Sequence, residues 1–193
     1  MMKLNKEYWE NRYQTDSAKW DIGHVSTPLK EYIDQLKNKD IKILIPGAGN
    51  AYELDYLIEK GFHNVFVIDF AQQPIDAILS RNKDLEKHII QGDFFNHNET
   101  YDLIIEQTFF CALNPSLREN YVSKMHDLLS DKGKISGLLF NFPLTEAGPP
   151  FGGSYEEYVN LFSEKFTIKT LEPAYNSIKP RANTELFFTF EKK

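Results

Sequence analysis

The chain has 193 residues, and its hydrophobic content of 41% provides enough apolar surface for one folded domain. Its 22 basic residues are outnumbered by 28 acidic ones, which leaves a net charge of −6 and disfavours a surface built to bind nucleic-acid phosphates. Because Cys111 is the single cysteine, an internal disulfide and a cysteine-rich zinc site are excluded.

The start of the chain carries charges and lacks the apolar run of a signal peptide, and no later segment has the length of a membrane span. No repeat and no low-complexity linker divides the sequence. We therefore expect a single cytoplasmic domain over residues 1–193. We also expect a monomer that binds no metal ion, no nucleic acid and no membrane.

Apolar runs that predict strands alternate along the chain with amphipathic segments that predict helices. A helical extension over residues 1–38 comes first, and Thr27 and Pro28 predict the start of a helix within it. The predicted strands cover residues 41–45, 65–68, 88–91, 101–105, 134–140, 166–171 and 185–191. The predicted helices between them end at Gly61, cover residues 73–82, run from Pro115 through Leu129, and follow Ser154.

Five strands separated by helices, followed by a final strand pair, predict an open α/β sheet. In such a sheet the ligand binds beyond the carboxyl ends of the strands. The helical extension precedes the first strand, so we expect it to form a lid over this edge.

The turn after the first predicted strand reads PGAGNAYELD and places Gly47 and Gly49 before a helix. Glycines here let the backbone approach a ligand at the helix N-terminus. Asp69 ends the second predicted strand, at the spacing where an acid accepts hydrogen bonds from a ribose diol. The combination predicts a nucleotide-type cofactor, and the alternative is a pair of turn glycines with a surface aspartate.

The kind of cofactor follows from neighbouring residues. A dinucleotide-binding turn usually has a third glycine where this chain has Tyr52, which disfavours NAD. Asp93 and Phe94 follow the third predicted strand, where they could contact an adenine. Two acids and no basic residue in the turn suit a cofactor without phosphate, such as S-adenosylmethionine, whose sulfonium favours aromatic walls. The N-terminal candidates for such a wall, each of which could instead be a core residue, are Trp9, Tyr13 and Trp20.

Several segments share a pattern with one known family. They read YWENRYQTDSAKWDIGHVSTPL, LIPGAGNAYELDYLIEKG, VIDFAQQPIDA, GDFF, YDLIIEQTFFCALNPSLRENYV and FPLTEAGPPFGGSYEEY. Together they resemble the thiopurine methyltransferase family, and most closely its halide and thiol methyltransferase branch. The resemblance spans nearly the whole chain. It implies a Rossmann-like class I methyltransferase: an open, mostly parallel sheet with helices on both faces, an antiparallel last strand and an N-terminal helical lid.

The resemblance also implies roles for individual residues. Those that match its S-adenosylmethionine site are Trp9, Tyr13, Trp20, Gly47, Asp69, Asp93, Phe94 and Gln107. Gln107 and Phe142 match acceptor-side positions that are often tyrosine in the halide and thiol branch. Arg181 could also lie near the acceptor and favour an anion, or it could be a solvated surface arginine.

The predicted reaction needs no catalytic acid or base, because methyl transfer from a sulfonium is an in-line displacement that mainly requires alignment and exclusion of water. The expected acceptor is a small soft nucleophile, with a thiol favoured. The alternatives are a halide, a thiopurine or a selenium or tellurium compound as acceptor, or a module that binds S-adenosylmethionine without catalysis. Glu106 could orient Gln107 or the cofactor's amino-acid part, or could lie in solvent, and we expect Cys111 to be buried.

Overall fold

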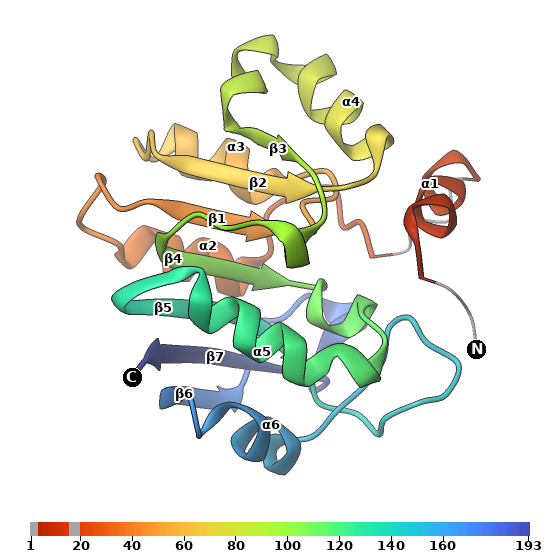
Figure 1. Ribbon diagram of the computed structural model, residues 1–193, viewed down its shortest axis with the longest axis vertical. Coiled ribbons are helices and arrows are strands. Elements are labelled where there is room, and N and C mark those ends of the chain that lie inside the picture. Colours follow the sequence, from red (N-terminus) through yellow and green to blue (C-terminus); the bar gives the residue numbers. More distant parts are fainter. Residues whose placement is uncertain (1–3, 16–19) are drawn as a thin grey trace.

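The computed structural model describes residues 4–15 and 20–193, and this part of the chain folds around one sheet. The sheet has seven strands in the order β3-β2-β1-β4-β5-β7-β6. They are β1 (Ile43–Pro46), β2 (Val65–Asp69), β3 (Ile89–Gln91), β4 (Tyr101–Gln107), β5 (Leu129–Phe140), β6 (Phe166–Pro173) and β7 (Glu185–Lys192). The strands β1 to β5 pair in parallel and all point toward the same edge, whereas β7 runs antiparallel to both β5 and β6 (Figure 1).

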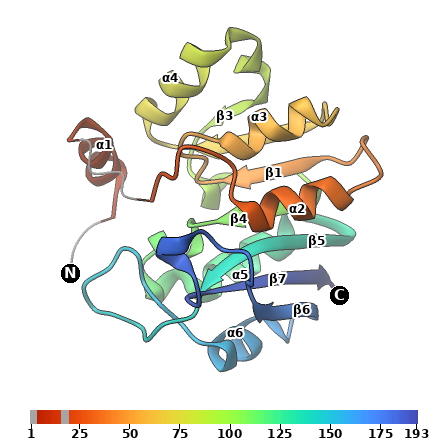
Figure 2. The same ribbon diagram turned by 180° about the vertical axis from the view of Figure 1, so that it is seen from behind.

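Helices cover both faces of the sheet (Figure 2). They are α1 (Lys6–Gln14), α2 (Thr27–Gln35), α3 (Tyr52–Glu59), α4 (Gln72–Arg81), α5 (Arg118–Asp127) and α6 (Tyr155–Phe162). The helices α2, α3 and α4 share one apolar cluster with the sheet, and α5 and α6 share the other. By contrast, α1 lies beyond the edge toward which the parallel strands point (Figure 1). No helix of the described ranges is long and apolar enough to cross a membrane.

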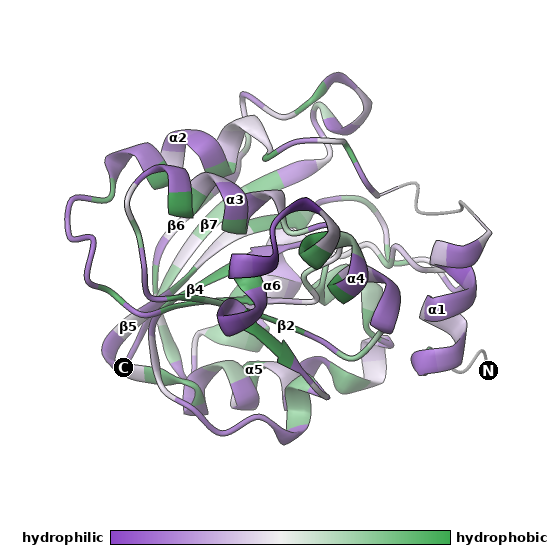
Figure 3. Ribbon diagram, turned by 90° about the horizontal axis from the view of Figure 1, so that it is seen from above, coloured by the Kyte–Doolittle hydropathy of each residue, from purple (hydrophilic) through white to green (hydrophobic). Residues whose placement is uncertain are grey.

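The core consists of two apolar layers, one on each face of the sheet. In β1, Leu44 belongs to the layer under α5 and α6, whereas Ile43 and Ile45 belong to the layer under α2 and α3. This alternation follows from the side-chain period of a strand. Since both faces are covered, the central strands are apolar at nearly every position (Figure 3).

All seven predicted strands are confirmed, and so is the mostly parallel sheet with an antiparallel last strand. Several element boundaries differ by one to three residues, and β5 begins at Leu129 and not at the predicted residue 134. The helix predicted to reach Leu129 ends at Asp127, and Leu129 instead begins β5, where it pairs with Tyr101. The apolar pair Leu128 and Leu129 continues the spacing of the helix, but a shift of register between β4 and β5 lets the strand begin there.

The N-terminal extension has two different roles in the fold. The helix α2 buries Leu29 and Ile33 against α3 and the sheet, so it covers a face of the sheet and does not extend over the edge. The helix α1 has no buried residue and lies at the edge itself. Of the predicted lid, α1 and the segment around Trp20 are therefore the described parts that can cover a ligand.

The N-terminus of α6 provides a test of the local sequence signals. The Ser154 hydroxyl accepts a hydrogen bond from the Glu157 backbone N–H, as an N-cap should. We expect Ser154→Ala to lower the free energy of unfolding by about 1 kcal/mol in urea titrations. Ser163→Ala, at the exposed other end of the same helix, is the control and should change it by less than about 0.5 kcal/mol. Equal effects of the two variants would contradict the capping role.

Candidate active site

A large cavity opens at the edge of the sheet where the parallel strands end. Its volume is about 1060 Å³. The ends of β1, β2 and β4 and the loop after β3 form its floor, and α1 and Trp20 form part of its wall. This is the position at which open α/β sheets bind their ligands.

The turn after β1 is built from left-handed residues. Gly47 and Gly49 have φ of +61° and +52°, and Ala51, which precedes α3, has φ of 51°. Glycine adopts this conformation without strain. A β-carbon on Gly47 would also overlap the ring of Phe109, so the close packing of this turn against the loop after β4 requires glycine as well.

Asp69 lies at the end of β2 with only 9% of its surface exposed, and it lines the cavity. Its carboxylate accepts hydrogen bonds from the backbone N–H of Ala71 at 2.9 Å and of Gly49 at 3.4 Å. Burial raises the pKa of Asp69 above its usual range, and these two bonds oppose that effect. The lone pairs that they leave free can accept hydrogen bonds from a ligand.

Asp93 and Phe94 lie together at a second part of the lining, just after β3. Asp93 is exposed, and one of its oxygens accepts a hydrogen bond from the Phe95 N–H at 2.9 Å. Phe94 is buried, with its ring centroid 5.1 Å from that of Phe109. An acid beside an apolar ring suits a flat heterocycle that carries an amino group.

Trp9, Tyr13 and Trp20 come together as an aromatic wall of the cavity. Trp20 meets the other two rings edge to face, with both centroid distances at 5.5 Å. The wall lies close to the turn after β1, because a β-carbon built on Gly49 would be 3.5 Å from the Tyr13 hydroxyl and 4.0 Å from Trp20 Nε1. Aromatic faces of this kind attract cations.

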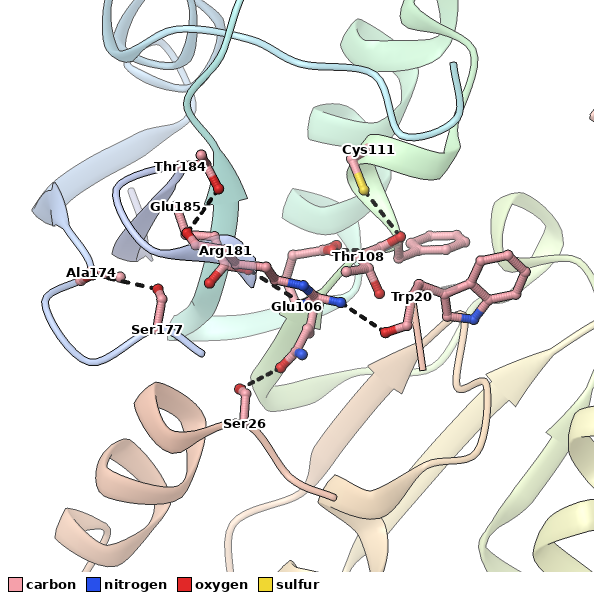
Figure 4. Close-up of polar contacts among 12 residues, drawn as sticks. Trp20, Ser26, Glu106, Thr108, Cys111, Ala174, Ser177, Arg181, Thr184 and Glu185 are labelled. Atoms are coloured by element: carbon pink, nitrogen blue, oxygen red, sulfur yellow. Dashed lines mark hydrogen bonds and ion pairs between the residues drawn. The ribbon is translucent and has the colours of Figure 1, made fainter. Parts of the chain in front are cut away.

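Three hydrogen bonds hold the segment that carries Trp20. Arg181 Nη2 donates a 2.8 Å hydrogen bond to the Trp20 carbonyl, and its Nη1 pairs with buried Glu185 at 3.4 Å (Figure 4). On the other side, Asp21 accepts hydrogen bonds from the Asn50 side chain and from the Tyr52 hydroxyl. Arg181 is buried and lines the cavity, so it is not a solvated surface arginine.

Gln107 and Phe142 are absent from the described lining of the cavity. Gln107 Oε1 accepts a hydrogen bond from the Ser26 hydroxyl at 2.6 Å, so its amide is directed toward the start of α2. The ring of Phe142 packs against Phe140 with the centroids 5.0 Å apart, and it is Phe140 that lines the cavity. The structure therefore does not bring these two residues together with the others.

Glu106 has a role that the sequence left open. Its side chain is fully buried and accepts hydrogen bonds from the N–H groups of Phe109 and Phe110 and from the Tyr121 hydroxyl, at 2.8, 3.0 and 2.6 Å. Burial raises the pKa of Glu106 to about 7. The carboxyl group shapes the loop after β4 and does not lie in solvent. The available sequence signal was an acid directly inside an apolar strand.

The loop after β4 brings two further residues to the cavity. Thr108 has φ of +62°, an uncommon conformation for a β-branched residue, and residues held in this way often belong to functional sites. Cys111 is a buried free thiol, as expected, and donates to the Thr108 carbonyl at 3.4 Å. Burial raises the pKa of Cys111, which keeps it a thiol and not a thiolate nucleophile.

The fold is that of a class I methyltransferase. A structure of a Burkholderia thailandensis 1,6-didemethyltoxoflavin-N1-methyltransferase, with bound 1,6-didemethyltoxoflavin and S-adenosylhomocysteine, aligns with a TM-score of 0.79 at 16% identity and covers 98% of this chain and 88% of that one. A sequence model described as thiopurine S-methyltransferase matches residues 4–192, so the chain belongs to the thiopurine S-methyltransferase family. It is thus a methyltransferase that uses S-adenosylmethionine as its methyl donor.

Two relatives with named acceptors share most of the chain. A probable thiol methyltransferase 2 of Arabidopsis thaliana is 26% identical over 156 residues, which cover 78% of this chain and 69% of that protein. A thiocyanate methyltransferase 1 of Brassica oleracea is 23% identical over 193 residues, covering 95% and 84%. These matches agree with the resemblance to the thiol branch of the family.

The chemistry of the lining fits S-adenosylmethionine. The hydroxyl groups of its ribose need acceptors, and Asp69 offers them from a buried position. Its sulfonium favours ring faces, and the aromatic wall supplies these. Gly47, in the turn after β1, lines the cavity and carries no side chain of its own.

The position of Asp69 leads to a binding prediction. We expect Asp69→Ala to weaken binding of S-adenosylhomocysteine by roughly 1 to 3 kcal/mol, because hydrogen bonds to a charged acceptor are lost. Calorimetric titration measures this directly. Asp76→Ala removes an exposed acid from α4 and serves as the control, with no expected change in affinity. Unchanged affinity of Asp69→Ala would contradict the placement of the ribose at this carboxylate.

The raised pKa of Glu106 leads to a stability prediction. Its folded pKa of about 7 exceeds the ordinary value of 4.5, so the folded state binds more protons between these values. The stability from this group is therefore full below pH 4.5 and is lost as the pH rises through 7. In urea titrations, the wild type should lose stability relative to Glu106→Gln as the pH rises from about 4.5 to about 8, which is roughly one unit above the folded pKa. A constant difference would contradict the raised pKa.

Proposed function

We propose that this methyltransferase transfers the methyl group to the sulfur of a small thiol by direct in-line displacement. The observation that carries the proposal is an acceptor side with apolar walls and no histidine among the described lining residues. Relatives named for thiol and thiocyanate methylation support it. A thiol needs little help to become a nucleophile, since its ordinary pKa of about 8.5 leaves a few per cent as thiolate at neutral pH.

The acceptor is proposed to bind between the loop after β4 and the end of β5. The residues that line this part of the cavity are Thr108, Cys111, Phe140, Pro149, Pro150 and Arg181. Most of this surface is apolar, which excludes water from the reacting atoms. The guanidinium of Arg181 keeps its charge at every relevant pH and adds a positive potential that favours a thiolate.

The cofactor contacts are proposed for the residues that share the cavity. Asp69 would hold the ribose, Asp93 and Phe94 the adenine, and the backbone at Gly47 the amino-acid part. The aromatic wall of Trp9, Tyr13 and Trp20 would close over the bound molecule. Since Gln107 and Phe142 lie outside the lining, we assign them no contact with cofactor or acceptor.

The roles of these residues in the reaction are alignment and shielding. When bound, S-adenosylmethionine supplies an electrophilic methyl group on a sulfonium. The proposed step forms the bond between the acceptor sulfur and that methyl carbon while the bond to the sulfonium sulfur breaks. A thioether and S-adenosylhomocysteine result, and the thiol proton has already passed to water. The walls at Phe140 and Trp20 hold the reactants together, which is the main source of rate in such a displacement.

An acceptor screen tests the proposal. The purified protein would receive S-adenosylmethionine with hydrosulfide, an aliphatic thiol, an aryl thiol, thiocyanate or iodide, and the methylated products would be measured in headspace and solution. The proposal predicts methyl thioethers from thiols at rates above those for iodide. Preference for iodide would contradict the thiol acceptor. Binding of S-adenosylhomocysteine without turnover of any compound would contradict catalysis.

The described residues assigned to the acceptor side include no carboxylate and no histidine, and this predicts a particular pH dependence. For two thiols of different pKa, the value of kcat/KM should rise with pH to a plateau at the pKa of each thiol. Steady-state kinetics with an aryl thiol and an aliphatic thiol would measure this. If both thiols show the same inflection, an ionising protein group controls the reaction and the proposed mechanism is wrong.

A further inference from the structure

Arg12 differs from the other cations of the cavity. Three basic side chains line the described cavity, and two of them have acidic partners. Lys6 pairs with Glu10 at 3.6 Å, and Arg181 pairs with Glu185. Within the described residues, Arg12 has no acidic partner, and its Nε is buried without a hydrogen-bond acceptor.

An arginine in this state needs a partner that the protein does not supply. The guanidinium cannot lose its charge, and a buried donor without an acceptor costs the full desolvation of that group. The side chain is also held in place, because its Cζ lies 5.5 Å from the centre of the Trp20 ring. A fixed, unpaired and partly buried guanidinium in a ligand cavity is suited to bind an anion.

The position of Arg12 relative to the turn after β1 narrows the choice of anion. Trp20, on which Arg12 lies, is next to Gly49 in that turn. The other charged groups of the cavity floor are the acids Asp69 and Asp93, which repel an anion. S-Adenosylmethionine carries one anionic group, the carboxylate of its amino-acid part.

We propose that Arg12 binds the carboxylate of S-adenosylmethionine through its guanidinium and so fixes the amino-acid end of the cofactor between Trp20 and the turn after β1. This inference rests on the cofactor placement given under the proposed function. It adds a charged contact from α1 to a site whose other contacts come from the strand ends. It also explains why α1, which buries no residue of its own, lies at this edge.

The test compares two probes that differ in the amino-acid part. S-Adenosylhomocysteine carries the carboxylate, whereas 5′-methylthioadenosine has the same nucleoside and lacks it. In calorimetric titrations, Arg12→Met should weaken binding of S-adenosylhomocysteine roughly 10- to 100-fold and leave that of methylthioadenosine unchanged. Methionine keeps an apolar stem against Trp20. The affinity of Arg12→Lys for S-adenosylhomocysteine should lie between those of the wild type and Arg12→Met.

A control on the same helix separates local from general charge effects. Lys6→Met removes one positive charge from the same lining, but that charge already has a partner in Glu10. The ratio of the affinities of Lys6→Met for S-adenosylhomocysteine and methylthioadenosine should equal the ratio measured for the wild type. Because α1 has no buried residue, these variants should keep the unfolding temperature of the protein without ligand.

The remaining outcomes overturn the inference in distinct ways. If Arg12→Met weakened the binding of both probes equally, Arg12 would only support the aromatic wall. No change for either probe, with a raised KM for the thiol, would assign Arg12 to the acceptor. Should the wild type bind S-adenosylhomocysteine in the predicted pattern and yet methylate no thiol, the proposed acceptor would fail while the Arg12 inference stands.

Discussion

The hydrogen bond from Arg181 to the Trp20 carbonyl joins two segments that are far apart in sequence and closes the cavity between them. Trp20 in turn contacts Trp9, Tyr13 and Arg12, so the position of Trp20 affects these three side chains of the cavity. The sheet supplies the floor of the site, but a floor open to water would not favour the displacement. The C-terminal part of the chain thus helps to build the lid that the N-terminal part carries.

Buried acids are a second feature of the chain around the strand ends. Glu53, Glu106 and Asp69 are all removed from water, and burial raises the pKa of Glu53 and Glu106 to about 7. Each is placed where the chain turns sharply at the carboxyl end of a strand or at the start of a helix. The carboxylates of Asp69 and Glu106 accept hydrogen bonds from backbone N–H groups that would otherwise lack a partner, so each fixes the shape of the loop that follows its strand.

Much of the fold and part of the site could be predicted from the sequence. Strands buried on both faces are apolar throughout, and Asp69 follows the glycine turn at a spacing that local geometry fixes. The partners of Glu106 and Arg181 could not be predicted, because they depend on how distant segments pack. Gln107 illustrates what the sequence could not predict. It lies at the end of a strand, as predicted, but its side-chain amide is directed toward Ser26 and not into the cavity. Side-chain direction is decided by such tertiary contacts.

The most direct test of this account is a double-mutant cycle between Arg181 and Trp20, with affinity for S-adenosylhomocysteine as the measured quantity. Arg181→Lys keeps a charge beside Glu185 while weakening the bond to the Trp20 carbonyl. If Arg181 acts by holding Trp20, Trp20→Ala and the double variant should bind equally weakly. If the losses of binding free energy in the two single variants add up in the double variant, Arg181 acts independently of the aromatic wall, and the central claim is contradicted.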